Sequence, residues 1–373
     1  MIERPIHILH VTFNMGIGGT EQVINQLVTN TQSGQVTHEI TCIDGFVGEI
    51  GQQLQARGIP VSCIKRQPGF DRELIRNLRE KIRVSGADIV HCHQYTPYLY
   101  GWLSALGLNA KIVFTEHGRF HPDRYRYKAV LVNQVMALLT SSIIAISDAT
   151  RSSLVRYEFI PRSKIRVIYN GIAPLRRDEP EIKKIREELG IPDKAFVVGT
   201  VSRLDKVKNQ AMMLRAFGQF LSHVPDAFLL IVGDGPERSE LERQAREQGI
   251  EMSVCFTGFI ARPAQYLALM DIFLLSSHTE GTSMTLLEAM SLGIPSVVTR
   301  VGGNPEIVID NETGYVVESD NDGAFSAAMV KMANNRSIRE RCSLASEERF
   351  HSHFSITKMT EQYLAVYRHC TDG

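Results

Sequence analysis

The chain has 373 residues, of which 43% are hydrophobic and 22% are charged, and its formal net charge is zero. This length favours two domains that each bury a core without disulfide bonds, which excludes a small disulfide-rich module. No segment approaches the roughly 20 apolar residues of a transmembrane helix, and the first residues indicate a buried strand rather than a signal peptide. The six cysteines form no Cys-x-x-Cys pair, so we expect free thiols in a reducing cytoplasm.

Charge is divided unevenly along the chain. The first 170 residues carry an excess of six positive charges, and the remainder an excess of six negative charges. A basic first half fits a domain that meets an anionic surface or acceptor, although unequal charge between domains is also common without such a partner.

Short apolar runs alternate with helical patterns in the first part of the chain. Strands are predicted at 6–13, 39–43, 60–64, 89–92, 111–115 and 142–146, with helices at 21–32, 49–57, 71–84, 95–106 and 127–140. This alternation predicts a parallel sheet covered on both faces.

The alternation restarts after the turn Asn170-Gly171 and a charged, solvated helix at 176–188. Strands are predicted at 196–202, 227–232, 254–257, 272–276, 296–299 and 314–317, with helices at 207–222, 237–248, 263–269, 284–292 and 322–334. We therefore predict two Rossmann-like, doubly wound α/β domains, 1–170 and 171–352. An amphipathic helix within 353–373 is expected to pack back on the first domain.

A glycine-rich loop follows the first predicted strand and contains Gly18, Gly19 and Thr20. Backbone N–H groups of such a loop lie at the carboxyl edge of a parallel sheet, where ligands bind. The loop lacks the third glycine of a dinucleotide fingerprint, so no nicotinamide cofactor is expected. A plain tight turn is the alternative.

His117 lies in the run Thr115-Glu-His-Gly118 at the end of another predicted strand. In that position it would hydrogen-bond a sugar hydroxyl or transfer a proton, and a structural histidine is the alternative. The basic, aromatic segment 119–128 follows directly. Its residues Arg119 and Arg124 would cradle an acceptor.

In the second domain, the loop after the first strand carries Arg203 and Lys208, five positions apart. Together they would bind a diphosphate, Arg203 through a bidentate guanidinium contact and Lys208 through its compact ammonium charge. Lys206 is an alternative phosphate ligand, and solvated loop cations are the alternative to any ligand role.

The most informative segment is Glu280-Gly-Thr-Ser-Met-Thr-Leu-Leu-Glu288, in which two carboxylates flank a predicted helix start. Ser283 or Thr282 would cap this helix, and its first backbone N–H groups would face an anion. One carboxylate would bind sugar hydroxyls and the other ribose hydroxyls, which fits a nucleotide-sugar. The donor-binding residues predicted in this segment are Glu280, Gly281, Thr282, Ser283, Met284, Thr285, Leu286 and Glu288.

Other glycines also end predicted strands. The backbone at Gly233 and Gly258 would frame a nucleobase, with ordinary turns as the alternative. Gly302 and Gly303 permit a close backbone approach, and Glu306 behind them would cap or touch donor hydroxyls.

Four arginines form one stripe of the helix predicted at 71–84, opposite an apolar face. A basic amphipathic helix indicates docking on an anionic membrane surface, and a plain surface helix is the alternative. The stripe consists of Arg72, Arg76, Arg79 and Arg83.

In this order, the motifs resemble the retaining GT-B glycosyltransferases of family 4 (glycosyl transferases group 1) over essentially the whole chain. The sequence at 280–290 is similar to that of bacterial enzymes of exopolysaccharide or lipopolysaccharide assembly. The resemblance implies a GT-B fold, with two Rossmann-like domains facing a central cleft. The matching positions are 18–21, 116–118, 170–171, 202–203, 208–209, 233–236, 280, 288, 302–303 and 306.

The resemblance also implies roles for the residues. Arg203 and Lys208 would neutralise the donor diphosphate, Glu288 would hold the ribose, and Glu280 would hold hydroxyls of the donor sugar. No metal and no cofactor are expected, because these cations and the helix N-terminus stabilise the phosphate charge.

On the acceptor side, the resemblance implies that His117 contacts the sugar near its anomeric centre and that the backbone of 18–19 lines the site. Glu306 would support the donor region. The sequence departs from the commonest family pattern at 283–285 and at 304–305, which is expected to shift donor preference.

The predicted function is transfer of a hexosyl group, with retention, from a UDP- or GDP-sugar to a glycan or lipid-linked acceptor in polysaccharide assembly. We expect a cytoplasmic protein, peripheral on the inner face of the membrane, with no nucleic-acid partner. Two alternatives are a nucleotide-sugar epimerase or sugar phosphorylase on the same fold, and a non-catalytic subunit that binds sugar nucleotides.

Overall fold

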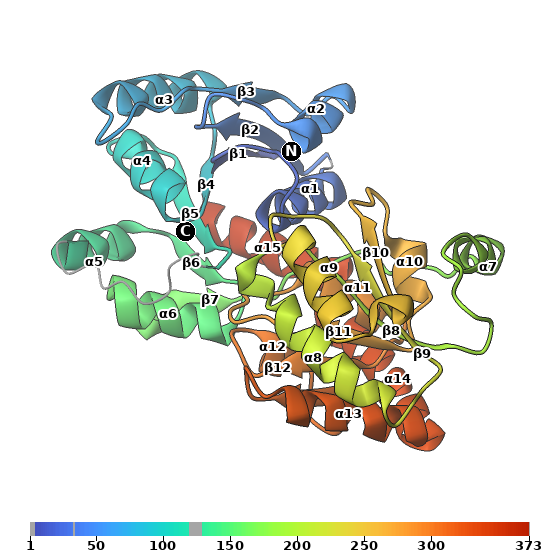
Figure 1. Cartoon of the computed structure of the whole chain (residues 1–373). Helices are drawn as coiled ribbons and strands as arrows, with labels where there is room; N and C mark the ends of the chain where they lie inside the picture. The colour runs from blue at the N-terminus through green and yellow to red at the C-terminus, as the bar shows by residue number, and fades with distance from the viewer. Residues whose placement is uncertain (1–3, 33, 119–128, 373) are drawn as a thin grey trace. The chain divides into compact units, whose positions relative to one another are not determined.

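The computed structural model describes residues 4–32, 34–118 and 129–372. The chain divides into two compact units (Figure 1): unit 1 comprises Met1–Gly171 with Ile356–Gly373, and unit 2 comprises Ile172–Ser355. These divisions lie one and three residues from those expected at 170/171 and 352/353.

Unit 1 is built on a seven-stranded sheet in the order β3-β2-β1-β4-β5-β6-β7, in which all neighbouring strands are parallel. The strand order reverses between β1 and β4, so the loops that follow these two strands diverge at the carboxyl edge. The strands are β1 Ile6–Thr12, β2 Val36–Cys42, β3 Val61–Cys63, β4 Ile89–His93, β5 Lys111–Glu116, β6 Ser142–Ala145 and β7 Ile165–Val167.

Helices cover this sheet, and local sequence explains where they begin and end. In α3, the carboxylate of Asp71 accepts the Leu74 N–H at the start, and Gly86 ends the helix in the left-handed conformation. The helices of unit 1 are α1 Gly19–Thr31, α2 Glu49–Ala56, α3 Arg72–Ser85, α4 Tyr95–Ala105, α5 Val130–Leu139, α6 Asp148–Glu158 and α15 Ile356–Thr371.

Unit 2 contains a six-stranded sheet in the order β10-β9-β8-β11-β12-β13, again with parallel neighbours. The order reverses between β8 and β11, so the loops that follow these two neighbouring strands border a crevice at the carboxyl edge. The strands are β8 Phe196–Val201, β9 Ala227–Val232, β10 Val254–Gly258, β11 Ile272–Leu275, β12 Ser296–Thr299 and β13 Gly314–Val317.

The central strands of unit 2 are continuous apolar runs because both faces of the sheet are covered. All six positions of β9 are buried, for example. The helices are α7 Glu179–Glu188, α8 Gln210–Leu221, α9 Arg238–Glu247, α10 Ala264–Ala268, α11 Met284–Ser291, α12 Asn304–Ile307, α13 Asp322–Asn334 and α14 Arg336–Arg349.

The sequence analysis did not predict four of these elements, one of which, α12, is a single turn of four residues. The strand β7 has only three residues, too few for an alternating pattern to show. The helices α6 and α14 are largely polar, so their apolar spacing is weak. Tertiary packing against the sheet, rather than amphipathic pattern, gives these segments their structure.

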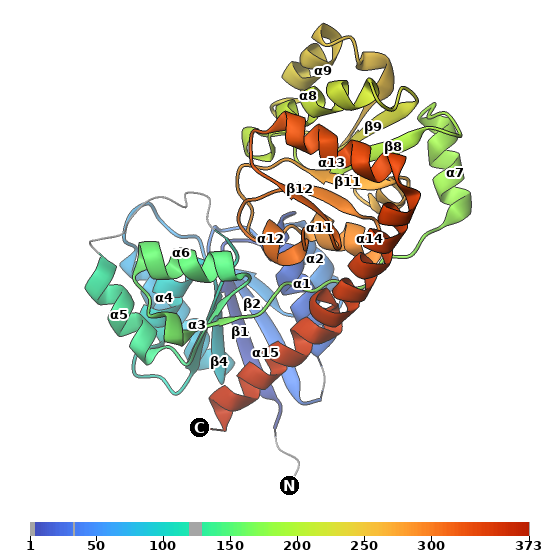
Figure 2. The ribbon, with the colours of Figure 1, turned by 90° about the horizontal axis from the view of Figure 1, so that it is seen from below.

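The last helix, α15, belongs to unit 1 and lies against α1 (Figure 2). Its buried face includes Tyr363 and Tyr367, whose hydroxyl groups hydrogen-bond Thr115 in β5 and His91 in β4. None of the helices formed by the described residues is long and apolar enough to cross a membrane.

Candidate functional site

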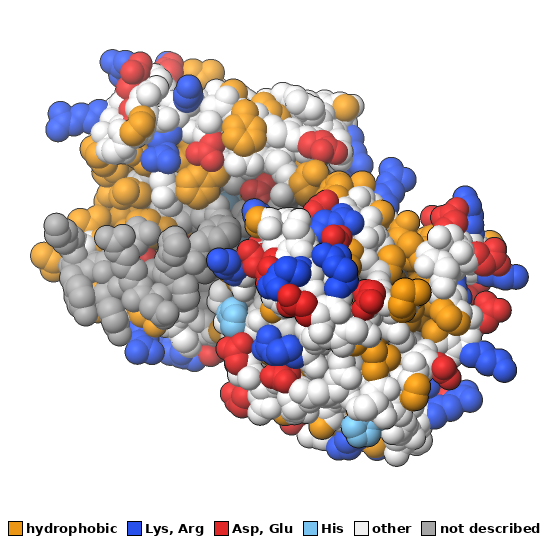
Figure 3. All heavy atoms as spheres, in the orientation of Figure 1, with side chains coloured by type: hydrophobic (Ala, Val, Ile, Leu, Met, Phe, Trp, Pro, Cys, Tyr) orange, Lys and Arg blue, Asp and Glu red, His pale blue; other side chains and the backbone are white. Residues whose placement is uncertain are grey.

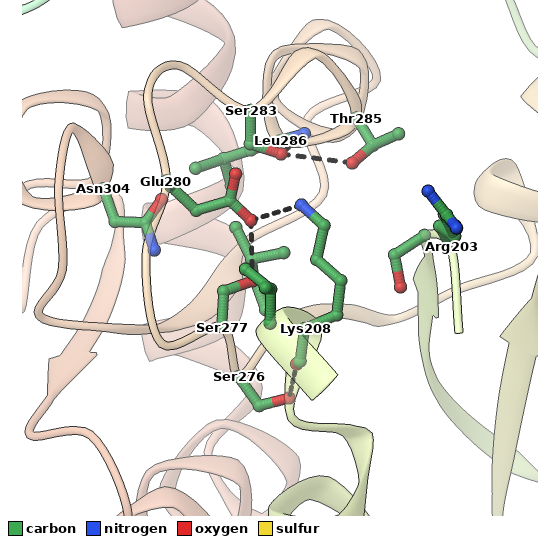
Figure 4. Close-up of polar contacts among 12 residues, drawn as sticks. Arg203, Lys208, Ser276, Ser277, Glu280, Ser283, Thr285, Leu286 and Asn304 are labelled. Carbon is green, nitrogen blue, oxygen red and sulfur yellow. Dashed lines mark hydrogen bonds and ion pairs between the residues drawn. The ribbon is translucent and has the colours of Figure 1, made fainter. Parts of the chain in front are cut away.

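The clearest polar contact joins the two loops of unit 2 that follow β8 and β11 (Figure 4). The Nζ atom of Lys208 lies 2.6 Å from Oε1 of Glu280, although 72 positions separate the two residues. Ser277 Oγ donates to the same carboxylate oxygen at 2.6 Å. The side chain of Lys208 is 24% exposed and that of Glu280 is 8% exposed. An ammonium group has three donors, so Lys208 retains N–H groups for an anion while it holds the carboxylate.

The other oxygen of Glu280, Oε2, has no hydrogen-bond partner among the described residues. A carboxylate oxygen accepts hydrogen bonds only, so this atom suits a hydroxyl group of a ligand. The pair therefore offers a cation and an acceptor side by side.

Backbone contacts fix the position of Lys208. It ends a short 3₁₀ turn, Lys206–Lys208, whose N–H groups at 207 and 208 are accepted by the Asp205 carboxylate at 3.1 and 3.2 Å. Ser276 Oγ donates to the Lys208 carbonyl at 2.9 Å. Of the two candidate lysines, Lys208 contacts the carboxylate, whereas Lys206 is exposed.

Arg203 has a fixed backbone and a largely exposed side chain. Its carbonyl accepts from Gln210 Nε2 at 2.8 Å, and a Cβ on the neighbouring Gly233 would lie 2.0 Å from the carbonyl oxygen of Ser202. Its guanidinium is 72% exposed and contacts Asp205 only at 3.8 Å. Figure 4 shows this side chain apart from the Lys208–Glu280 pair. It is available for a second phosphate contact.

The helix α11 begins at Ser283, whose Oγ accepts the Leu286 N–H at 3.4 Å. Of the two caps considered, Ser283 is the one that forms. The cap accepts the N–H of Leu286, so only two of the three amides that were expected to face an anion remain available, those of Met284 and Thr285. The N–H groups of Met284 and Thr285 lie in the first turn, where helix geometry leaves them without an intrahelical partner.

The glycine pair at 302–303 packs against the loop that carries Glu280. Gly302 has a φ of +49°, and a Cβ there would lie 1.7 Å from the Glu280 carbonyl oxygen. The N–H of Gly303 donates to the carbonyl of Gly281 at 3.1 Å. The close approach that the glycines permit is thus to this loop, which they hold in place.

Asn304 follows that pair and is a candidate that sequence reasoning missed. It is fully buried, and its Nδ2 donates to the carbonyl of Thr299 at 3.1 Å. Its Oδ1 is buried without a partner among the described residues. Figure 4 places the side chain beside Glu280. In the sequence, Asn304 stands out only as a departure from the commonest family pattern, and Ser277 gives no signal at all.

Glu288 lies one turn inside α11, on the same helix whose N-terminus adjoins Glu280. No described residue forms a hydrogen bond or ion pair with its carboxyl group. Burial raises the pKa of this group to about 7, because desolvation penalises the charged form. The side chain is half-buried, and a desolvated carboxylate is costly unless a ligand supplies hydrogen-bond donors.

Gly233 and Gly258 meet each other at the end of their strands. The N–H of Gly233 donates to the carbonyl of Gly258 at 3.0 Å, and both residues have positive φ. Close packing of the strand ends is sufficient to require glycine at these positions. A contact with a nucleobase stays a prediction.

In unit 1, His117 follows β5. Its Nε2 lies 2.9 Å from Nδ1 of His93, and its own Nδ1 is buried without a partner among the described residues. Burial lowers the pKa of His117 to about 3, so the ring is neutral at pH 7. Gly18 precedes the first turn of α1, and the surroundings of Gly19 are open.

The remaining acceptor-side residues are only partly placed. Thr20 is half-buried in the first turn of α1. Glu306 lies in α12, directly behind the glycine pair. Arg119 and Arg124 lie outside the described residues.

The arginine stripe of α3 is largely engaged within unit 1. Arg79 donates to two backbone carbonyls at the end of α4, at 3.1 and 2.5 Å. Arg76 and Arg83 pair with glutamates of their own helix at 3.4 and 2.6 Å. Arg72 is exposed. The positive charge available to an anionic surface is therefore smaller than the spacing alone indicated.

The described residues also include one cluster with the donor set of a metal site. The buried rings of His10, His91 and His93 each place one nitrogen within 4.8 Å of the others. Neutral imidazoles are common metal ligands. Here, however, the ring nitrogens already hydrogen-bond one another or neighbouring hydroxyls.

Family models match both units. The model for glycosyl transferases group 1 matches residues 181–349, and that for Glycosyltransferase Family 4 matches residues 17–176. The chain is 28% identical over 306 residues to the N-acetyl-alpha-D-glucosaminyl L-malate synthase of Bacillus anthracis, covering 80% of this chain and 79% of that protein. It is 24% identical to the UDP-Gal:alpha-D-GlcNAc-diphosphoundecaprenol alpha-1,3-galactosyltransferase of Escherichia coli, covering 97% and 96%.

Solved structures share the fold. Anabaena HepE, crystallised with UDP, superposes with a TM-score of 0.86 at 22% identity, over 97% of this chain and 99% of that one. A glycosyltransferase from Rickettsia africae gives a TM-score of 0.88 at 20% identity, over 99% of each chain. Two Rossmann-like parallel-sheet units of this kind form the GT-B architecture.

Proposed function

The chain belongs to the GT-B glycosyltransferases of family 4, and on this premise we propose that it is a retaining, metal-independent hexosyltransferase. Its donor is a UDP- or GDP-sugar, and its acceptor is a glycan or a lipid-linked sugar in exopolysaccharide or lipopolysaccharide assembly. The observation that carries the proposal is the contact between Lys208 Nζ and Glu280 Oε1 beside the N-terminus of α11.

The charges around this contact suit a nucleotide diphosphate. Lys208 and Arg203 supply two cations, and the N–H groups of Met284 and Thr285 supply two neutral donors at the positive end of a helix. Donors held in place before the reaction stabilise charge that grows on the leaving phosphate, and no metal ion is needed for that task.

The two carboxyl groups bind different parts of the rest of the donor. Oε2 of Glu280 accepts a hydrogen bond from a hydroxyl of the sugar, and Glu288 accepts from the ribose. The acceptor oxygen attacks the anomeric carbon on the face that the nucleotide leaves. Its proton passes to the departing phosphate, the C–O bond to the nucleotide breaks, and the new glycosidic bond forms with retained configuration.

Of these two acceptor classes, two observations favour the lipid-linked sugar. The galactosyltransferase of Escherichia coli cited above is named for a diphosphoundecaprenol-linked sugar. In unit 1, α5 exposes several apolar side chains, and Figure 3 shows hydrophobic side chains at the edge of the unit where Figure 1 places this helix. They include Leu131 (77% exposed), Val135 (51%), Leu138 (68%) and Leu139 (59%).

The first test follows nucleotide release from a panel of UDP-, GDP- and ADP-sugars, with and without membrane lipid. Lys208→Ala should reduce turnover at least ~100-fold, the scale of losing one such donor at a transition state. Lys206→Ala is the matched control, since this lysine belongs to the same 3₁₀ turn but is exposed. Near-normal turnover in Lys208→Ala would refute the phosphate role. Conversion of a donor to its epimer without nucleotide release would favour the epimerase alternative.

A further inference from the structure

A continuous row of imidazole rings crosses the interior of unit 1 and ends at His117. His38 lies in β2, His10 in β1 and His93 in β4. The ring nitrogens of neighbours along this row are each 2.9 Å apart: His38 Nδ1 to His10 Nε2, His10 Nδ1 to His93 Nε2, and His93 Nδ1 to His117 Nε2. Every link is a hydrogen bond between two imidazoles.

The far end of the row is anchored by a threonine. Nε2 of His38 lies 2.7 Å from Oγ1 of Thr31, the last residue of α1. The same Oγ1 donates its hydrogen to the carbonyl of Leu27, also at 2.7 Å. A hydroxyl has a single hydrogen, so Thr31 must accept from His38.

Each neutral imidazole has one N–H donor and one bare acceptor nitrogen. Because Thr31 accepts from Nε2 of His38, Nδ1 of His38 is the bare nitrogen and accepts from Nε2 of His10. The same reasoning passes along the row to His93 and then to His117. At every ring the hydrogen is on Nε2, and the row ends in the bare Nδ1 of His117.

The opposite polarity of the row is less favourable. Thr31 would then donate to His38 and lose its bond to the Leu27 carbonyl, so one hydrogen bond fewer would form in total. It would also leave an unpaired N–H, rather than a lone pair, at His117. Rings along the row are buried, and burial lowers the pKa of His38 to about 3 and those of His10 and His93 well below the ordinary value. Protonated rings therefore do not interrupt the row at pH 7.

We propose that the row Thr31–His38–His10–His93 fixes the tautomer of His117, so that its Nδ1 is a permanent hydrogen-bond acceptor for a hydroxyl group of the ligand. Thr31, His38, His10 and His93 are then positioning residues. This inference rests on the proposed function, because it assigns the ligand group as a hydroxyl of the sugar or acceptor. It excludes His117 as a proton donor in the reaction.

The unpaired state of Nδ1 supports this assignment. A buried polar atom without a partner is rare in folded proteins and generally indicates a missing ligand or water. Phosphate oxygens also carry only acceptors at neutral pH, so a bare nitrogen repels them and selects an O–H group.

Histidine-selective ¹⁵N NMR of the full chain, without any donor, tests the row directly. The signals of His117 are assigned by their loss in His117→Gln. Wild-type protein should show a protonated Nε2 and a bare Nδ1 at this ring. In Thr31→Val the preference should be lost, with the Nδ1–H form rising to a comparable population, whereas Thr31→Ser should restore the wild-type spectrum.

Thr140→Val is the matched control. Thr140 is a buried helix-end threonine of the same unit that also donates to the carbonyl four residues before it, at 2.7 Å, and hydrogen-bonds the Tyr98 hydroxyl. It should leave His117 unchanged. An Nδ1–H tautomer in wild type, or equal spectra for Thr31→Val and wild type, would overturn the proposal. So would a shift of the His10, His91 and His93 signals on addition of Zn²⁺, because the cluster would then be a metal site.

Turnover gives the second readout. With the donor identified by nucleotide release, Thr31→Val should lower kcat/KM several-fold, and Thr31→Ser should restore it. Adding that donor should move the His117 Nδ1 signal, whereas the matching free nucleotide should not; movement by neither would overturn the hydroxyl contact. Because the tautomer is measured without substrate, failure of the row and failure of the transferase function are distinguishable.

Discussion

Replacing Glu288 by glutamine should stabilise unit 2 at neutral pH. The side chain is half-buried, its carboxyl group has no hydrogen-bond partner among the described residues, and desolvation raises its pKa from 4.5 to about 7. In the unfolded chain, the group releases its proton near pH 4.5; in the folded protein, it keeps it until about pH 7. Folding therefore binds a proton in this window, and wild-type stability falls as pH rises.

The magnitude follows from the two pKa values. Each pH unit between 4.5 and about 7 costs about 1.4 kcal/mol of unfolding free energy, so the full penalty is about 3 kcal/mol at pH 7 and above. Glutamine is neutral and nearly isosteric, so Glu288→Gln removes the penalty. The two proteins should be equally stable near pH 4.5 and differ by about 3 kcal/mol at pH 8.

The assay must report on unit 2, because the single tryptophan, Trp102, lies in unit 1. Urea unfolding followed by hydrogen exchange of peptides from β8 and β11 meets this need. Glu312→Gln, at an exposed carboxylate of the same unit, is the control and should change stability little. A stability difference for Glu288→Gln that stays constant from pH 5 to pH 8 would refute the reasoning. Weaker donor binding by the stabilised variant would link the buried charge to function.

Two further predictions concern the loop at 280 and the surface of α5. Gly302→Ala puts a Cβ 1.7 Å from the Glu280 carbonyl oxygen and should reduce turnover at least ~100-fold, as for loss of the Lys208 donor. The control Gly323→Ala, whose Cβ would have its nearest neighbouring atom at 3.8 Å, should be tolerated. Full activity of Gly302→Ala in a nucleotide-release assay would contradict the packing argument. The double change Leu131→Ser/Leu138→Ser should lower the vesicle-binding constant, measured by co-sedimentation with phosphatidylglycerol vesicles, by about 100-fold. Burying each apolar side chain contributes about 1.5 kcal/mol or more, so losing two costs about 3 kcal/mol. Unchanged co-sedimentation would exclude α5 as the docking face.

Local sequence was sufficient for much of the fold and for part of the site. Strands such as β9, β12 and β13 have the bounds expected from their apolar runs. Capping chemistry, which acts over four residues, placed the start of α11 at Thr282 or Ser283, and Ser283 forms the cap. The GT-B fold followed from the resemblance of the ordered motifs, and the solved structures share it.

Some local expectations were wrong or incomplete because a neighbour acts on them. The Leu286 N–H donates to the cap of its own helix. The sequence alone did not decide whether Thr282 or Ser283 forms this cap. The arginine stripe of α3 was correctly placed on a helix, but Arg79 binds carbonyls of α4. The spacing of charges along one helix does not reveal which partners come from another element.

By itself, the sequence determined the alternation of strands and helices, the position of the glycine turns and the residue types that suit a nucleotide-sugar. These depend on interactions within one strand, helix or turn, where the separation of two residues in the sequence fixes their relative positions in space. Only the tertiary structure decided which of these residues meet. In unit 2, β8 and β11 are neighbouring strands, and their pairing brings Lys208 to Glu280 across 72 positions of sequence. The sheet of unit 1 likewise aligns His38, His10 and His93 from three strands into one row. The register of the parallel strands places all three side chains on the same face of the sheet.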